Sequence, residues 1–288
     1  MKLKSRAKIN LSLDIIGKRE DGYSLVEMIM QSIDLYDMID IKEIVKDKII
    51  IKSNSDNLPL DRNNIAYKAA SLIKNNFEIK NGVEIFIDKN IPIAAGLAGG
   101  SSNAAAVLVG LNKIWSLGLN EKELQKLGAQ LGADVPFCIS GRASLAENIG
   151  EKLTDIKGLP QNTNIVVCKP DVNISTKMVY SKFDISNVEK RPDTKKIVEM
   201  LNAGDFAYVA KNMQNVLESV TTKEVEDINK IKLIMNENAI GSLMSGSGPT
   251  VFGIFKNKKE ANLCSEKLKT SYAQTYVVTT SDIGVEIC

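Results

Sequence analysis

The sequence contains no histidine among its 288 residues. This absence excludes a Ser-His-Asp triad, a His-Glu-x-x-His metalloprotease site and a histidine ligand to haem. It also removes the side chain that most often serves as a general acid or base. Acid and base chemistry in this chain therefore has to use carboxylates, lysines or tyrosines.

Clusters of basic and aromatic residues are missing as well. The chain has 37 Lys and Arg residues against 35 Asp and Glu residues, and aromatic residues make up 5% of it. Nucleic-acid binding favours a basic face, often with aromatic side chains interleaved. The sequence shows neither, so we expect no nucleic-acid partner.

Long apolar runs are also absent. The longest, such as residues 104–111, fall well short of the roughly 20 residues that span a bilayer, and residues 1–6 lack an apolar signal region. We expect a cytoplasmic protein with no membrane partner. The cysteines are scattered without a Cys-x-x-Cys pair, which predicts reduced thiols and no zinc site; they are Cys138, Cys168, Cys264 and Cys288.

Apolar residues make up 44% of the chain, enough for one large or two medium lobes. The second half mixes helical patterns with short strands, which predicts an α+β fold. The loop 157–160 is expected to separate a domain of residues 1–157 from one of residues 158–288. In the first half, apolar patterns predict strands at 9–15, 26–35, 38–44, 49–51 and 83–87 and a helix at 63–77.

The most informative segment is the glycine-rich run of residues 92–103, which precedes an apolar helical stretch at 104–115. Three close glycines, Gly96, Gly99 and Gly100, permit positive φ angles and a close backbone approach to a ligand. Ser101, Ser102 and Asn103 are cap-forming residues, so the positive end of the helix dipole is expected to face the loop. Phosphate is the usual ligand of that geometry.

The run is neither a Walker A loop nor a dinucleotide fingerprint, because it lacks both Gly-Lys-Ser/Thr and Gly-x-Gly-x-x-Gly. A turn that binds nothing is the less favoured alternative. A second loop of glycine and serine, residues 241–250, is read either as a simple hairpin turn or as a segment that packs on the first loop or approaches a diphosphate. Taken alone, Asp134 fits a helix N-cap and Lys8 a solvated strand lysine.

Three blocks together resemble the motifs of the GHMP small-molecule kinases: Ala-Lys-Ile-Asn-Leu at 7–11, the loop 92–103 and the loop 241–250. The loop Gly-Leu-Ala-Gly-Gly-Ser-Ser-Asn and the block Leu-Gly-Ala-Asp-Val-Pro-Phe at 131–137 are most similar to a branch whose substrate is a cytidine-diphosphate-linked polyol. The resemblance covers essentially the whole chain. It implies a two-lobe fold, with an N-terminal ATP-binding lobe and a C-terminal ferredoxin-like lobe, that transfers phosphate from ATP with Mg²⁺.

The resemblance also implies roles for individual residues. Asp134 matches the catalytic base that also binds the substrate hydroxyl, and Lys8 matches the lysine beside it. A carboxylate can accept a hydroxyl proton while a neighbouring ammonium keeps that carboxylate ionised. The matching cytidine-substrate residues are Asn10, Tyr23, Ser24 and Tyr180. The matching ATP residues are Pro92, Ile93, Ala94, Ala95, Gly96, Leu97, Ala98, Gly99, Gly100, Ser101 and Ser102, with Asn64 and Lys89 near the adenine.

One position departs from the pattern of the family. Ser24 stands where a histidine usually reads the cytosine edge, and its shorter reach calls for a water or a backbone contact, or for looser selectivity. Two alternatives to the cytidine-substrate kinase stay open at this point: another GHMP kinase acting on mevalonate, homoserine or a sugar, and a nucleotide-binding regulator without catalysis. Lys8 and Asp134 together argue against the regulator. We expect a monomer or a weak homodimer.

Overall fold

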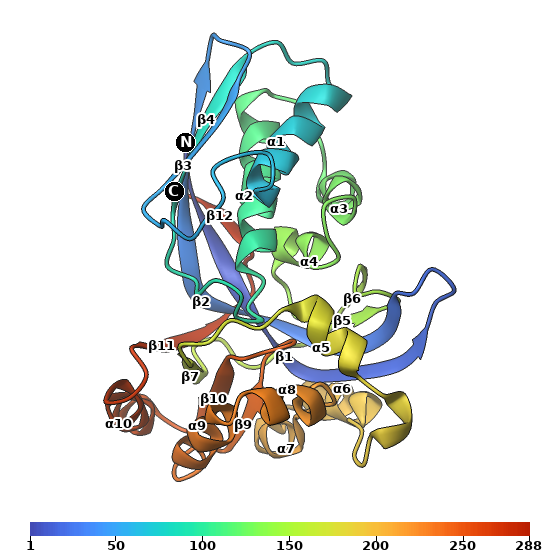
Figure 1. Ribbon diagram of the computed structural model, residues 1–288, viewed down its shortest axis with the longest axis vertical. Coiled ribbons are helices and arrows are strands. Elements are labelled where there is room, and N and C mark those ends of the chain that lie inside the picture. Colours follow the sequence, from blue (N-terminus) through green and yellow to red (C-terminus); the bar gives the residue numbers. More distant parts are fainter.

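The computed structural model describes residues 1–288 and shows two lobes, one above the other in Figure 1. The N-terminal half is built on two long antiparallel strands, β1 (Lys2–Lys18) and β2 (Ser24–Ile44). Two separate strands were predicted between residues 26 and 44, and this was wrong. The strand continues because no glycine or proline interrupts it, and a β-bulge at Asp34 and Leu35 takes up the irregularity.

Further strands extend this sheet, and helices cover one of its faces. β4 (Gly82–Asp88) pairs with β2 and lies parallel to β3 (Ile49–Ser53), while β5 (Ser144–Glu147) joins β2 to β6 (Lys152–Asp155). Figure 1 shows the helices stacked beside the sheet. Residues 104–108 of the central helix are fully buried, so its alanines fix its close approach to the strands. The helices are α1 (Ile65–Asn76), α2 (Gly99–Ile114), α3 (Glu121–Ala129) and α4 (Val135–Ser140).

The C-terminal half holds four antiparallel strands in the order β11-β7-β10-β9. The chain runs from β7 (Asn164–Lys169) through helices to the hairpin of β9 (Gly241–Met244) and β10 (Val251–Phe255), then through α10 (Lys258–Lys269) to β11 (Gln274–Ser281). This is the β-α-β-β-α-β arrangement of ferredoxin-like folds. The predicted α+β fold with a ferredoxin-like C-terminal lobe is therefore confirmed.

Several short elements lie between β7 and β9. Figure 1 shows them along the lower lobe, with the first of them facing the space below α4. They are α5 (Thr176–Lys182), the 3₁₀ helix η1 (Ile185–Asn187), α6 (Thr194–Ala203), α7 (Phe206–Asn212), β8 (Gln214–Asn215), α8 (Glu218–Glu224) and α9 (Asp227–Met235).

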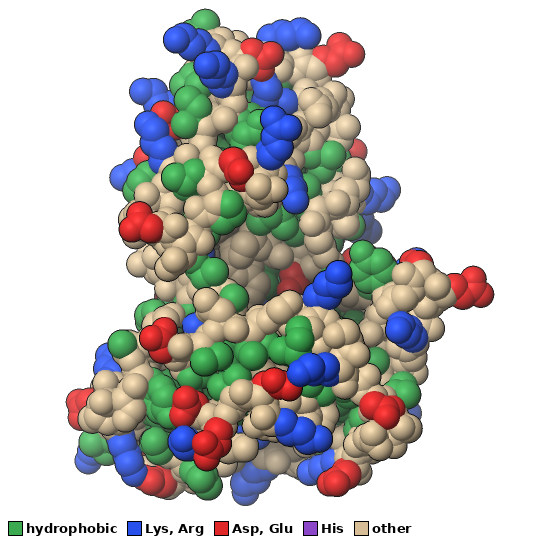
Figure 2. Space-filling model, in the orientation of Figure 1, with side chains coloured by type: hydrophobic (Ala, Val, Ile, Leu, Met, Phe, Trp, Pro, Cys, Tyr) green, Lys and Arg blue, Asp and Glu red, His purple; other side chains and the backbone are tan.

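The two halves share one sheet and one apolar cluster. β11 pairs with β2 as well as with β7, and β12 (Val285–Ile287) returns the end of the chain to β1. A buried cluster joins Ile9 of β1, Leu97 of the glycine-rich loop and Phe252 of β10. The surface is hollowed where the lobes meet (Figure 2). The proposed division at residues 157 and 158 falls in the loop between β6 and β7 and stays a prediction.

None of the helices combines the length and the apolar character that crossing a membrane requires.

Candidate active site

The glycine-rich loop takes its left-handed conformations at different residues from those predicted. Positive φ angles occur at Ala94 (51°), Gly96 (72°) and Ala98 (56°), whereas Gly99 and Gly100 open helix α2. Of the two roles expected for these glycines, positive φ and close backbone approach, Gly99 and Gly100 do not show the first. Their lack of a side chain matters for space at Gly99, where a Cβ would lie 3.0 Å from both the Lys89 ammonium and an Ile91 methyl.

The helix also begins earlier than predicted, which changes the role of its polar residues. Ala98 occupies the N-cap position without a side-chain hydrogen bond, and its carbonyl accepts from the Ser102 N–H at 2.8 Å. Ser101, Ser102 and Asn103 are therefore the third to fifth residues of the helix, and their prediction as caps was wrong. The Ser102 hydroxyl is buried and has no hydrogen-bond partner within the protein.

The backbone N–H groups of residues 93–101 form a run of unused donors. No N–H from Ile93 to Ser101 donates to a backbone or side-chain oxygen, whereas the N–H groups of Ile91 and Ser102 on either side are bonded. The run ends at the positive end of a 16-residue helix. Free donors that converge at a helix N-terminus favour an anion, and phosphate fits this arrangement.

The two loops rich in glycine contact each other directly. The Ser245 hydroxyl donates to the Gly96 carbonyl at 3.0 Å, and a Cβ on Gly96 would lie 2.1 Å from the Ser245 carbonyl oxygen. The second loop also connects β9 and β10 as an antiparallel hairpin. Both predicted roles, the hairpin turn and the close packing on the first loop, are confirmed. A hydrogen bond of 2.9 Å between Thr176 and Ser247 ties helix α5 to the same loop.

Lys8 and Asp134 meet beside this loop. The Lys8 backbone N–H donates to the Leu97 carbonyl at 3.2 Å, which holds β1 against the loop. The Lys8 ammonium lies 3.8 Å from an Asp134 carboxylate oxygen and donates to Asn10 Oδ1 at 2.7 Å. The Lys8 side chain is 5% exposed and that of Asp134 31% exposed. A buried ammonium thus faces a carboxylate that a substrate can reach.

The simpler alternatives for these two residues fail. Asp134 stands at the N-cap position of α4 but makes no capping hydrogen bond, so its carboxylate is free for other chemistry. Lys8 is buried, which rules out a solvated strand lysine. The side-chain N–H of Asn10 donates to the Met28 sulfur at 3.2 Å, so the side-chain carbonyl of Asn10 is oriented toward the Lys8 ammonium.

Tyr180 and Cys138 lie close enough to Asp134 to respond to its charge. Burial, followed by the negative charge of Asp134, raises the pKa of the Tyr180 phenol, so it stays neutral. Burial and the same carboxylate raise the pKa of the Cys138 thiol, which is consistent with its predicted place in the core. Tyr180 comes from helix α5, so an element of the second half of the chain lies near Asp134.

Tyr23 and Ser24 are not joined to this centre by any contact. Tyr23 is 61% exposed in the turn between β1 and β2, where its N–H donates to the Asp21 carboxylate at 3.2 Å. Ser24 is half-buried at the start of β2. An exposed ring offers a face to a flat ligand, so the predicted stacking role stays a prediction.

Asn64 and Lys89 use their side-chain polar atoms for hydrogen bonds within the protein. The side-chain carbonyl of Asn64 caps α1 by accepting from the Ala66 N–H, while its side-chain amide donates to the Pro59 carbonyl. The Lys89 ammonium lies 2.7 Å from the carboxylate of Asp37, and burial lowers its pKa despite that charge. Their predicted contacts with adenine stay predictions.

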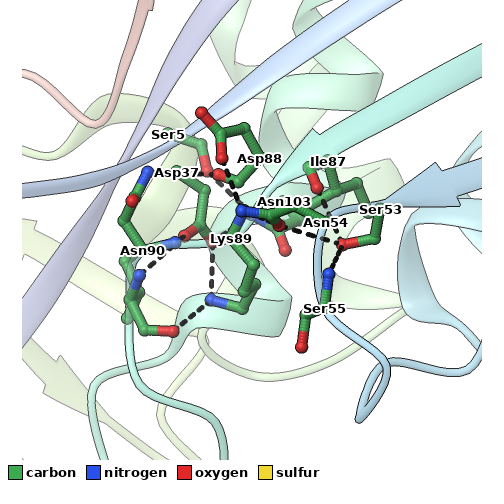
Figure 3. Close-up of polar contacts among 11 residues, drawn as sticks. Ser5, Asp37, Ser53, Asn54, Ser55, Ile87, Asp88, Lys89, Asn90 and Asn103 are labelled. Carbon is green, nitrogen blue, oxygen red and sulfur yellow. Dashed lines mark hydrogen bonds and ion pairs between the residues drawn. The ribbon is translucent and has the colours of Figure 1, made fainter.

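Sequence reasoning missed Asp37, a fully buried carboxylate behind the glycine-rich loop (Figure 3). The sequence carries little signal for it, because Asp37 is one of three aspartates within residues 34–40 of the strand. No group of three Asp, Glu, Cys or His side chains gathers into a metal site.

Comparison with known proteins identifies the family. The chain matches the GHMP kinases N terminal domain at residues 64–142 and the GHMP kinases C terminal family at residues 197–274. It is 60% identical to the 4-diphosphocytidyl-2-C-methyl-D-erythritol kinase of Clostridioides difficile (strain 630), over 100% of this chain and 98% of that protein. It is 50% identical to the enzyme of the same name from Caldicellulosiruptor bescii, over 98% and 99% of the two chains.

Solved structures agree. A crystal structure of 4-(cytidine 5'-diphospho)-2C-methyl-D-erythritol kinase superposes with a TM-score of 0.82 at 29% identity, over 98% of this chain and 99% of that one. The homoserine kinase of Cytophaga hutchinsonii shares the fold, with a TM-score of 0.80 at 19% identity over 100% and 97% of the two chains. The chain therefore belongs to the GHMP kinase family of small-molecule kinases, and within it to the 4-diphosphocytidyl-2-C-methyl-D-erythritol kinases.

Proposed function

We propose that the protein uses ATP to phosphorylate the 2-hydroxyl of 4-diphosphocytidyl-2-C-methyl-D-erythritol, a step in non-mevalonate synthesis of isoprenoid precursors. The observation that carries this proposal is the Lys8–Asp134 pair beside a run of unused N–H donors. A base next to an anion cradle suits transfer of a phosphoryl group to a hydroxyl. A nucleotide-binding regulator has no need of that base.

Asp134 is the proposed general base. Its carboxylate accepts the proton of the 2-hydroxyl while that oxygen bonds to the γ-phosphorus, and the bond from this phosphorus to the β,γ-bridging oxygen breaks to release ADP. The Lys8 ammonium, 3.8 Å from that carboxylate, stabilises the negative charge on the attacking oxygen. Asn10 holds the ammonium in place at 2.7 Å.

The loop residues 92–102 are proposed to bind the phosphates of ATP. Their free N–H groups and the dipole of α2 supply positive potential without a side-chain cation. Magnesium is proposed to enter with ATP, bound to its phosphate oxygens. Asn64 and Lys89 remain proposed neighbours of the adenine.

The cytidine end is proposed to bind at Tyr23, Ser24 and Tyr180. The 61% exposed ring of Tyr23 can stack on the cytosine, and the neutral Tyr180 can close over the other side. Ser24 lacks the reach of the histidine usual at this position, so we propose that a water completes the contact with the base edge. The use of ATP as donor makes the cytoplasm the proposed compartment.

Identification of the product tests the proposal. The purified chain, incubated with MgATP and the cytidine-diphosphate-linked substrate, is expected to yield ADP and a new phosphate monoester, which ³¹P NMR assigns to carbon 2. Release of inorganic phosphate alone would contradict the function. Recovery of the cytidine-diphosphate-linked substrate unmodified after ATP has been consumed would contradict it as well.

A further inference from the structure

Asp37 holds both ends of the glycine-rich loop from behind. Its carboxylate is fully buried at the middle of β2, yet it accepts four hydrogen bonds (Figure 3). One oxygen accepts from the Asn90 and Ile91 N–H groups, each at 2.7 Å. The other accepts from the Lys89 ammonium and the Asn103 amide, again at 2.7 Å each.

These donors bracket the run of unused N–H groups. Asn90 and Ile91 come just before the run of residues 93–101. Asn103 comes two residues after the run and is the fifth residue of α2. The same Asn103 amide also donates to the Ser5 hydroxyl at 3.0 Å on β1. One carboxylate therefore fixes the entry of the loop, its exit into the helix and the distance between them.

The loop needs such an anchor because its own conformation is unfavourable. Ala94 and Ala98 hold φ angles near +50°, which side chains with a Cβ rarely adopt and which persist only where the surroundings impose them. A buried carboxylate that lost its donors would be equally unfavourable. The four bonds thus lock the two elements into one arrangement.

We propose that Asp37 is a positioning residue for the phosphates of ATP, acting through the loop and helix α2 without touching the nucleotide. This inference rests on the proposed function, because the loop must be the phosphate site. It assigns part of the affinity for ATP to a side chain behind the cradle. Asp37 sets the spacing between the free N–H groups and the helix terminus.

The direct test changes Asp37→Asn. An amide offers only one acceptor oxygen, so either the two backbone N–H donors or the two side-chain donors lose their partner. Because this variant leaves the Lys89 ammonium buried without its counter-charge, a second variant, Asp37→Asn with Lys89→Met, removes that charge as well. A third, Asn103→Ala, cuts the bond at the helix end alone and keeps the carboxylate.

The readout is the Kd of MgATP by isothermal titration calorimetry without the second substrate, together with the Tm. We expect the Kd to rise at least about tenfold in both Asp37 variants and by a smaller factor in Asn103→Ala, since misplacement by about 1 Å strongly weakens such contacts. The double variant should regain Tm relative to Asp37→Asn, while its Kd stays above that of Lys89→Met alone, the control needed because Lys89 is itself a proposed neighbour of the adenine. If Asp37 contributed to stability alone, the double variant would regain both its Tm and its affinity for MgATP.

Asp34→Asn is the matched control. Asp34 lies three residues away on the same strand, but its carboxylate pairs with Arg6 at 2.9 Å and is 46% exposed. The Asp34→Asn substitution should therefore leave the Kd of MgATP unchanged. A Kd within about twofold of wild type in a folded double variant or in Asn103→Ala would overturn the proposal. Failure of the wild type to phosphorylate the cytidine substrate, with MgATP still bound, would overturn the function alone; failure to bind MgATP would overturn both.

Discussion

Gly96→Ala should destabilise the junction between the two loops more than any other alanine in the glycine-rich run. The backbone at Gly96 has a φ of +72°, and an added Cβ would lie 2.1 Å from the Ser245 carbonyl oxygen and 3.1 Å from the Gly248 nitrogen. Both close atoms belong to the backbone of the second loop. They cannot rotate away as a side chain would, so one loop has to move.

The expected cost follows from two terms. A non-glycine residue in the left-handed region costs about 1–2 kcal/mol, and overpacking a well-packed contact adds about 1–3 kcal/mol. Together these lower the free energy of unfolding by roughly 2–5 kcal/mol. At about 2–4 °C per kcal/mol for large domains, the Tm should fall by roughly 4–20 °C.

Gly100→Ala provides the control within the same loop. Gly100 has helical geometry, and its added Cβ would meet only an Ile65 methyl at an ordinary 3.5 Å. Because alanine favours a helix over glycine, the Tm should stay level or rise slightly. Thermal unfolding followed by circular dichroism compares the two. Equal losses of Tm, or no loss in Gly96→Ala, would refute the assignment of the left-handed positions and of the loop contact.

Three further predictions concern the chemistry, the substrate and the acid stability. Asp134→Asn or Lys8→Met should lower kcat at least about a hundredfold, because the first removes the proposed general base and the second the ammonium beside it. The Kd of MgATP, measured by calorimetry, should stay nearly unchanged. Near-normal turnover in both variants would exclude a catalytic role for these two residues. Tyr23→Ala should weaken cytidine diphosphate by about 1–3 kcal/mol of lost stacking, and Ser24→His should sharpen cytidine over uridine in competition binding, whereas unchanged affinities would remove both from the substrate site. Hydrogen bonding to an arginine lowers the pKa of Glu286, so its stabilising effect is present above the usual glutamate pKa and is lost as the pH falls through the lowered value. In Glu286→Gln the acid-induced drop in Tm should therefore be smaller, and an identical pH profile would contradict this.

Local sequence signals predicted those parts of the fold that depend on neighbouring residues. The Asn-x-x-Glu spacing at Asn120 and Glu123 is typical of a capping box, and both of its hydrogen bonds form at the start of α3, because all the atoms lie within one turn. The start of α2 was misjudged for the converse reason. Ala98 ends the loop in a left-handed conformation that tertiary packing imposes, and an alanine carries no sequence signal for it.

The candidate site divides in the same way. A run of glycines before a helix indicates an anion site whatever the rest of the chain does. The approach of Lys8 to Asp134 joins residues 126 positions apart, and only resemblance to a family predicted it. Asp37 was missed because its donors come from two other segments, residues 89–91 and Asn103, and the sequence does not distinguish it from the neighbouring aspartates of its strand.

The measurement that tests the central claim most directly is a comparison of kcat/KM for ATP-dependent phosphorylation of three acceptors by one enzyme preparation. The acceptors are 4-diphosphocytidyl-2-C-methyl-D-erythritol, homoserine and mevalonate, with ADP release followed in a coupled assay. The account predicts efficient turnover of the cytidine-diphosphate-linked acceptor and turnover little above background for the other two. In Asp134→Asn, activity on the cytidine-diphosphate-linked acceptor should fall to about 1% of the wild-type value or less. Preferred turnover of homoserine or mevalonate, or wild-type rates in the Asp134 variant, would contradict it.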